Sequence, residues 1–251
     1  MSVLLPLVAA ASPAVAVACI AGSYLLGTFP SAWLATRRRG VDPTAAGSGN
    51  PGATNVYRTA GRGAGVLTLV GDVLKGAGAA ALGWAVGGHG LGVACGVAAV
   101  LGHVAPLTPG PAHGRSGDTS RSEGASGHTS RSHRRSGHNS RSHGRSGRAS
   151  GTRVLRGGKG VATVAGMAVV LFPLAALVSA AAFGVVTALS RTVSLGSIAA
   201  VAVLPAAAGA LGAPGHEVAA LAGCAVIVIA RHRSNIGRLW RGEEPHLGTA
   251  A

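Results

Sequence analysis

Charged and aromatic side chains are scarce in this 251-residue chain. Charged residues make up 12% of it and aromatic residues 3%, whereas soluble domains contain about 25% charged residues. Acidic residues number only 7, while hydrophobic residues reach 48%, with 41 glycines besides. These figures exclude an ordinary water-soluble domain and a wholly disordered chain, and they indicate a membrane protein whose helices are rich in small residues.

Cysteine is also rare. The three cysteines, Cys19, Cys95 and Cys224, all lie in apolar stretches. Their spacing fits no metal site, and three thiols cannot all pair, so we expect small core residues. We therefore expect no metal ion and no other cofactor.

Three stretches carry almost no charge and are long enough to cross a bilayer, which takes about 20 apolar residues. Residues 1–36 and 76–114 have no Lys, Arg, Asp or Glu, and 161–230 have only Arg191 and Glu217. The sequence thus predicts an all-α integral membrane protein. Its apolar segments lie at about 13–34, 64–83, 88–107, 161–190, 194–212 and 215–230.

Basic residues gather at 35–63, at 108–160 and in the tail from 231. The positive-inside rule places all three segments, and the C-terminus, in the cytoplasm, with the N-terminus outside. An even number of spans must then separate the second segment from the tail. Splitting 161–190 at Pro173 gives seven transmembrane helices, some of them short, and merging 194–230 gives five. We prefer seven, because only Lys75 of the 22 basic residues then lies away from the cytoplasmic side.

A ten-residue repeat interrupts the apolar pattern within 109–153, with copies that begin at Ser116, Ser126 and Ser136. Its Ser, Gly, Arg and His residues offer little to bury, so we expect a disordered insertion in a cytoplasmic loop of a single membrane domain, 1–251. Its arginines are typical of a solvated loop or of one attracted to anionic lipid. They have no interleaved aromatic residues on which bases stack, so we expect no specific nucleic-acid partner.

The first candidate site segment runs from Gly47 to Arg58. It combines glycines with hydroxyl and amide side chains and ends in an arginine, a composition that presents backbone N–H groups and a guanidinium to an anion. A flexible connecting loop is the alternative. The candidate phosphate-binding residues are Gly47, Ser48, Gly49, Asn50, Thr54, Asn55 and Arg58.

The second segment, 156–160, contains Gly158 and Lys159 and opens directly into an apolar helix. A glycine turn at a helix N-terminus favours anions, and the lysine adds a point charge. A Walker A loop is excluded, because Gly160 stands where that motif requires Ser or Thr.

The third segment, 231–238, follows the last apolar stretch. His232 and Asn235 are three residues apart and share a helix face, and His232 is a candidate base or hydrogen-bond donor. The arginines by themselves are typical of an anchor on the inner side.

Asp72 and Lys75 are likewise three residues apart, within the second apolar segment. Ionised groups at this depth usually face a polar interior. Either a structural ion pair or support for a polar site explains them.

Together these segments predict a site for a charged small molecule at the inner membrane surface. They contain no paired carboxylates, metal-ligand cluster or cysteine nucleophile, which leaves a group transfer involving a phosphate-bearing substrate. The alternative is a small-solute transporter, since transporters also use polar sites among broken helices.

The motifs GSGNPGATNVYR at 47–58, RGGKGVATVAG at 156–166 and RHRSNIGRLWRGEE at 231–244 resemble the bacterial PlsY family of membrane acyltransferases. GHVAPL at 102–107, GDVLKG at 71–76 and RTVSLGSI at 191–198 fit the same pattern. The likeness extends from about Gly22 to Glu244, apart from the repeat. The corresponding stretch is short in the family, but an inserted loop with close ends is tolerated, so we expect an active enzyme.

The resemblance implies transfer of a fatty acyl group from acyl phosphate to the 1-hydroxyl of glycerol 3-phosphate, which yields lysophosphatidic acid and phosphate. It implies a multi-pass protein of the bacterial cell membrane with its active site toward the cytoplasm, and we expect a monomer. By resemblance Ser48, His232 and Asn235 act in catalysis. Arg58, Lys159 and Ser194 bind substrate, with Asp72 and Lys75 in support.

Overall fold

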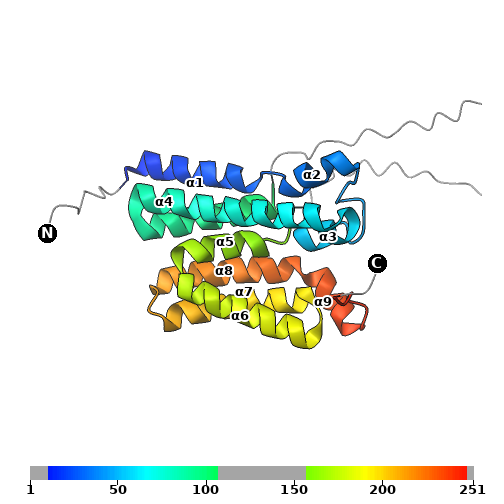
Figure 1. Ribbon diagram of the computed structural model, residues 1–251. Helices are drawn as coiled ribbons and strands as arrows, with labels where there is room; N and C mark the ends of the chain where they lie inside the picture. The colour runs from blue at the N-terminus through cyan, green and yellow to red at the C-terminus, as the bar shows by residue number, and fades with distance from the viewer. Residues whose placement is uncertain (1–10, 107–156, 248–251) are drawn as a thin grey trace, which may run out of the picture. The chain divides into compact units, whose positions relative to one another are not determined.

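A computed structural model describes residues 11–106 and 157–247 (Figure 1), all within one compact unit formed by Met1–Gly110 and Leu155–Ala251. The repeat predicted at 109–153 lies outside the described residues. Every regular element in the described part is helical, which confirms the all-α prediction. The helices are α1 Pro13–Gly27, α2 Ser31–Thr36, α3 Ala53–Ala60, α4 Arg62–Val104, α5 Val161–Leu171, α6 Pro173–Ser190, α7 Val193–Ala210, α8 Gly215–Arg231 and α9 Arg233–Trp240, with a 3₁₀ turn, η1, at Arg37–Arg39.

The first predicted segment, 13–34, is interrupted in the structure. Helix α1 ends at Gly27, and α2 begins after Pro30. Proline has no backbone N–H to continue a helix, and it restricts the residue before it. The apolar run therefore forms two helices.

Helix α4 reverses direction at a pair of glycines. Gly87 and Gly88 have non-helical backbone angles, and Gly88 has φ +80° and ψ −176°, a conformation open essentially to glycine alone. The two arms pack closely, because a Cβ on Gly83 would lie 2.5 Å from the carbonyl oxygen of Leu91. The arms correspond to the segments predicted at 64–83 and 88–107.

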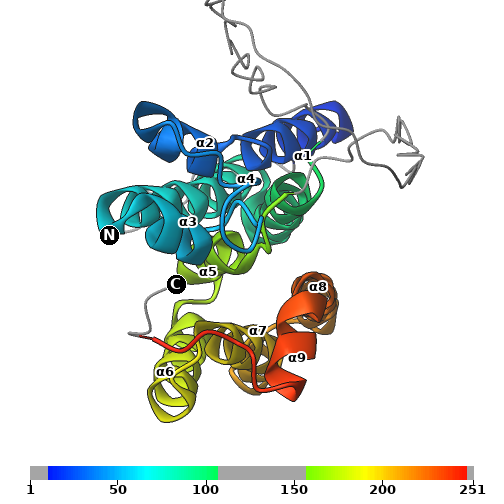
Figure 2. The same ribbon diagram turned by 90° about the vertical axis from the view of Figure 1, so that its right-hand side faces the viewer.

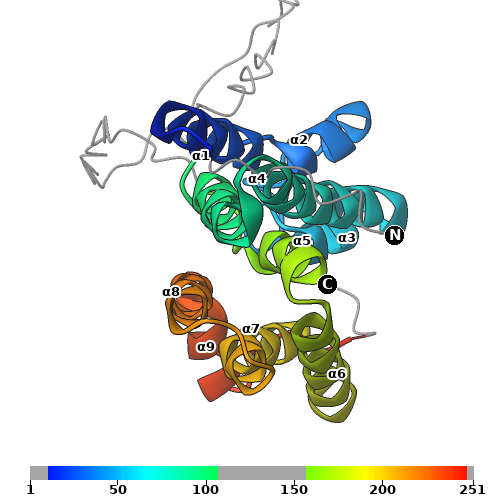
Figure 3. The ribbon, with the colours of Figure 1, turned by 90° about the vertical axis from the view of Figure 1, so that its left-hand side faces the viewer.

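The apolar run 161–190 is also divided. Helix α5 ends at Leu171, Phe172 has φ −135° and ψ 58°, and Pro173 is the first residue of α6, a position where its missing N–H is not needed. The predicted break at Pro173 is therefore confirmed. Helices α6, α7 and α8 then pack in sequence, each against the next (Figure 3).

Small residues bring the helices together, and large apolar residues face outward. Where α4 crosses α5, a Cβ on Gly76 would lie 2.0 Å from the carbonyl oxygen of Thr163, and one on Gly166 would lie 2.0 Å from that of Val73. In contrast, Leu189 of α6 is 83% exposed. Close backbone contact inside with apolar side chains outside is typical of helices packed within lipid.

Four helical stretches are long and apolar enough to cross a membrane: Pro13–Arg39, α4, α6 and α7. Helices α8 and α9, bent by 58° relative to each other, make a fifth if they form one broken span. Helix α5 is shorter, at 11 residues, and α4 is counted once despite its reversal. The described part thus contains four to five candidate spans. The short helices α2, α3 and α9 lie at one end of the unit, which Figure 2 views directly.

Candidate active site

Asn55 shapes the first site segment. Its amide oxygen accepts the backbone N–H of Ser48 at 2.9 Å, and its amide nitrogen donates to the carbonyls of Pro43 and Ala46 at 3.0 and 3.1 Å. The side chain is buried and engaged with the loop at both ends of its amide. It therefore holds the loop in place, a role that the composition of the segment alone did not distinguish from substrate contact.

The loop presents its polar groups outward. Gly47 and Gly49 have positive φ angles of +57° and +66°, which favour glycine. Ser48, Thr54 and Arg58 are exposed, and Arg58 lies one helical turn after Asn55 on α3. Helix α3 therefore carries both Asn55, which holds the loop in place, and the guanidinium of Arg58.

The second segment is a tight turn pressed against the end of α4. The N–H of Gly158 donates to the carbonyl of His103 at 3.1 Å, and Arg231 donates to the carbonyl of Gly157 at 2.7 Å. A Cβ on Gly157 would lie 2.3 Å from the carbonyl oxygens of His103 and Val104. Only glycine fits there, so the turn delivers Lys159 to a defined place.

Lys159 is the residue on which the segments converge. Burial lowers the pKa of its ammonium to about 8, an effect that Glu244 opposes and that the positive charges of Arg238, Arg58 and Arg231 reinforce. These four side chains come from α3, α8, α9 and the tail. The structure therefore brings the three predicted segments into one electrostatic neighbourhood.

Glu244 supplies the negative charge within this neighbourhood. One carboxylate oxygen accepts hydrogen bonds from Ser194 and Asn235, both at 2.7 Å, and the other accepts from Arg238 at 2.7 Å. Burial by itself raises the pKa of Glu244, but these three donors and the charge of Arg238 outweigh it, and the pKa lies below its usual value. Ser194 and Asn235, two of the predicted site residues, thus meet at one oxygen of Glu244.

His232 lies at the bend between α8 and α9 and is 1% exposed. Its Nδ1 is 2.8 Å from the carbonyl oxygen of Val228. A carbonyl only accepts, so Nδ1 carries the proton and Nε2 has the free lone pair. Burial and the charge of Lys159 lower the pKa of this imidazole to about 4, so the ring is neutral at neutral pH. His232 therefore offers a proton acceptor next to the cationic cluster.

Asp72 and Lys75 form the predicted ion pair, at 2.8 Å, and both are buried. Ser31 donates to the same carboxylate oxygen of Asp72, and Lys75 donates to the carbonyl of Phe29 at 3.2 Å. The Nδ1 of His103 is 3.6 Å from that oxygen. The Asp72–Lys75 pair thus lies next to the side chain of His103, whose backbone carbonyl accepts the N–H of Gly158 in the Gly157–Gly158 turn.

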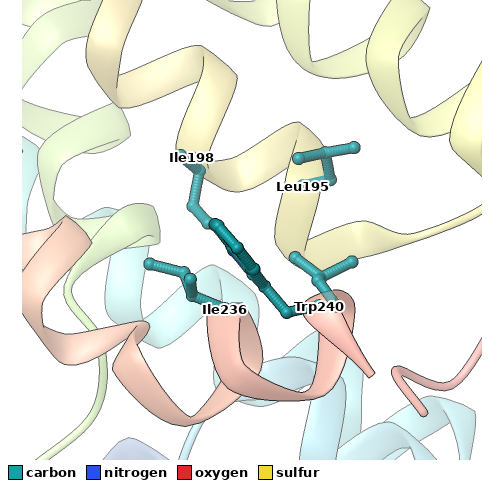
Figure 4. A pocket seen from close by; sticks show the side chains of 5 residues that line it. Leu195, Ile198, Ile236 and Trp240 are labelled. Carbon is teal, nitrogen blue, oxygen red and sulfur yellow. The ribbon is translucent and has the colours of Figure 1, made fainter. Parts of the chain in front are cut away.

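The two helices that carry Ser194 and Asn235 also line an apolar groove. It has a volume of roughly 530 Å³ and lies between α7 and α9 (Figure 4). Leu195 directly follows Ser194 in the chain, and Ile236 directly follows Asn235. The lining residues are Leu195, Ile198, Ile236, Leu239 and Trp240.

Two residues that contact the candidate site, Glu244 and His103, were not singled out in the sequence. Glu244 was only the end of a motif, although an acid that follows a basic helix is a signal of an ion pair. His103 lay in an otherwise apolar stretch, where nothing separates it from a structural histidine. The contacts of both residues join segments far apart in the chain, which sequence spacing does not reveal.

The helices and this cluster define a class: an all-helical, multi-pass integral membrane protein with a cationic site suited to phosphate groups. The family model for glycerol-3-phosphate acyltransferase matches residues 17–121 and 149–242 and leaves out most of the repeat. The chain therefore belongs to the glycerol-3-phosphate acyltransferase family.

Individual relatives support this assignment. The chain is 36% identical over 226 residues to the glycerol-3-phosphate acyltransferase of Trichlorobacter lovleyi, covering 90% of this chain and 94% of that protein. It is 37% identical to that of Synechococcus sp. over 232 residues, covering 90% and 91%. It also matches the crystal structure of PlsY (YgiH), an integral membrane glycerol 3-phosphate acyltransferase, in its glycerol 3-phosphate form. That match has a TM-score of 0.72 and 29% identity, and it covers 94% of this chain and 96% of the other. A second form of PlsY, with lysophosphatidic acid, matches with a TM-score of 0.70.

The low pKa of Lys159 predicts an alkaline limit to activity. Below about pH 8 the ammonium is present, and above it the charge is lost, so kcat/KM for acyl transfer should fall as the pH rises through about 8. Lys159→Arg should move this fall upward, because a guanidinium keeps its proton. Arg233→Lys, an exposed change on α9, is the control. An identical pH profile in Lys159→Arg would contradict the assignment.

Proposed function

We propose that the chain transfers a fatty acyl group from acyl phosphate to the 1-hydroxyl of glycerol 3-phosphate, giving lysophosphatidic acid and inorganic phosphate. Family membership and the match to PlsY in its glycerol 3-phosphate and lysophosphatidic acid forms support the acceptor and the product. The observation that carries the proposal is the meeting of cationic side chains at one buried turn: Arg231 donates to the carbonyl of Gly157 at 2.7 Å, and the charges of Arg58 and Arg238 act on Lys159. Two phosphate-bearing substrates need such a concentration of cations.

The reaction is a displacement at an activated carbonyl. The acceptor hydroxyl oxygen bonds to the acyl carbon, the bond from that carbon to the phosphate oxygen breaks, and phosphate leaves with the electron pair. A leaving phosphate needs charge stabilisation more than protonation, which Arg58 and Lys159 are suited to supply. Two anions held side by side gain further rate from proximity.

The hydroxyl proton has two candidate acceptors. The Nε2 of His232 is available because Nδ1 is bonded to Val228. The phosphate of the acceptor itself is the other. We propose that Ser48, exposed on the preformed loop, donates a hydrogen bond to a substrate phosphate, with Asn235 and Ser194 shaping the site through Glu244.

The apolar groove supports a lipid substrate. Two of its lining residues, Leu195 and Ile236, directly follow Ser194 and Asn235 in the chain, and a third, Trp240, is 88% exposed. An open apolar groove on helices that also carry polar site residues fits an acyl chain drawn from the membrane.

We further propose seven transmembrane helices: α1, the two arms of α4, α5, α6, α7 and α8. The N–H of Leu247 in the tail donates to the carbonyl of Arg191 at 2.7 Å, so the α6–α7 junction lies beside the tail. Arg231 likewise contacts Gly157, so the start of α5 lies there as well. Both contacts support the seven-helix topology, which puts an even number of spans between the residues that meet.

The positive-inside rule then puts this end, and the active site, on the cytoplasmic face of a bacterial cell membrane, with the N-terminus outside. The predictions of a monomer, of no cofactor and of no nucleic-acid partner remain predictions.

Labelling tests the topology. With a membrane-impermeant thiol reagent on intact cells, Gly215→Cys should react, and Arg191→Cys should react only after permeabilisation. The unsubstituted chain, with its three native cysteines, is the control. Reaction of Arg191→Cys in intact cells would favour the five-helix alternative instead.

Ser48→Ala should abolish product formation, with a loss of about 10²-fold or more if its hydroxyl binds a phosphate in the transition state. The assay uses purified protein in detergent, labelled glycerol 3-phosphate and palmitoyl phosphate, with palmitoyl-CoA as the alternative donor. Thr44→Ala, an exposed change in the same loop, should remain active. Product from palmitoyl-CoA, or full activity in Ser48→Ala, would overturn the donor or the role of the serine.

His232→Ala at saturating substrate concentrations distinguishes the two proton acceptors. If His232 is the base, turnover should fall by about 10²-fold or more. Near-normal turnover would assign the proton to the phosphate of the acceptor. His216→Ala, an exposed change at the start of α8, controls for the loss of an imidazole.

A further inference from the structure

His103 lies near the end of α4 and is 7% exposed, yet no step of the acyl transfer proposed for this protein uses it. Its backbone carbonyl accepts the N–H of Gly158 at 3.1 Å. Its ring also packs against the turn, because a Cβ added to Gly158 would lie only 2.0 Å from the ring Nε2. The imidazole is therefore in direct contact with the backbone of the residue before Lys159.

The other edge of the ring faces a fixed charge. The Nδ1 of His103 is 3.6 Å from Oδ1 of Asp72, too long for a direct hydrogen bond but close enough for the charge to orient the ring. That carboxylate is itself held by Lys75 at 2.8 Å and by Ser31. The imidazole thus lies between a buried, anchored ion pair and the glycine turn.

We propose that His103 is a positioning residue for acyl transfer: its imidazole, oriented by Asp72, supports the Gly157–Gly158 turn and so fixes the place of Lys159. This inference rests on the proposed function of Lys159 as a phosphate-binding group. It also gives the buried Asp72–Lys75 pair a role, as the anchor behind the ring.

The turn has no room to adjust around the ring. Both glycines approach α4 so closely that a side chain on either would collide with His103, and Arg231 also holds the turn through the carbonyl of Gly157. Loss of the ring leaves a space into which the turn can relax. A shift of about 1 Å in a positioning group is enough to reduce a rate by about 10²-fold.

The relaxed turn would move Lys159 relative to every charge that surrounds it. Those charged or titratable groups are Arg58, Arg231, His232, Arg238 and Glu244. A displaced Lys159 should therefore titrate differently as well as bind phosphate less well.

A double-mutant cycle with Lys159 tests the proposal. His103→Ala should lower kcat/KM by about 10- to 100-fold in the otherwise unchanged chain. In a Lys159→Gln background the same substitution should cause less than about a threefold further loss, because the group through which His103 acts is gone. His103→Ala should also shift the alkaline fall of activity away from about pH 8, a readout that general loss of stability does not move.

His89→Ala is the matched control. His89 lies in the same helix and contacts Glu217 at 2.8 Å and the carbonyl of Leu171 at 2.9 Å, remote in the chain from the site segments. Any loss that it causes should be equal in both backgrounds and should leave the pH profile unchanged. His103→Gln, which retains polar atoms and some bulk, should recover part of the activity and serves if the alanine variant does not fold.

Equal losses from His103→Ala, or from His103→Gln in its place, in both backgrounds would overturn the proposal, as would an unshifted pH profile. Full activity in Lys159→Gln would overturn it too, together with the assigned role of Lys159. Failure of the unchanged chain to form lysophosphatidic acid is a separate outcome that refutes the proposed function itself.

Discussion

The carboxylate of Glu244 holds the cationic end of this protein together. It accepts hydrogen bonds from Ser194 on α7 and from Asn235 and Arg238 on α9. A buried carboxylate is stable only when its oxygens accept hydrogen bonds, so the folded chain has to keep these donors next to it. Two helices and the tail are thereby fixed relative to one another, and the histidine at the α8–α9 bend with them.

The same region is arranged to attract anions. Lys159 lies among three arginines with one carboxylate to offset them, and burial further disfavours its ammonium form. A group held in this way gains more from a bound phosphate than a solvated lysine would, because the anion relieves both the repulsion and the loss of solvent. The repulsion and the loss of hydration at Lys159 thus add to the affinity of this region for phosphate.

Several features followed from the sequence because their causes are local. Pro173 begins a helix, as the predicted division of 161–190 requires, and the predicted gap between 64–83 and 88–107 is where the Gly87–Gly88 pair reverses α4. The apolar runs predicted helices in a membrane, and the glycine, lysine and arginine motifs predicted a phosphate site at one end. The spacing of Asp72 and Lys75 predicted a shared helix face, on which the structure pairs them.

The sequence by itself determined the class of structure, the positions of most helix breaks and the residue types of the candidate phosphate site, because backbone restrictions and hydrophobicity act over a few residues. Only the tertiary structure decided that Asn55 holds the loop of Ser48, that Glu244 joins Ser194 to Asn235, and that His103 separates Asp72 from the turn of Lys159. These contacts depend on which helix ends pack at the same side, and packing is a property of the whole chain that no local pattern records.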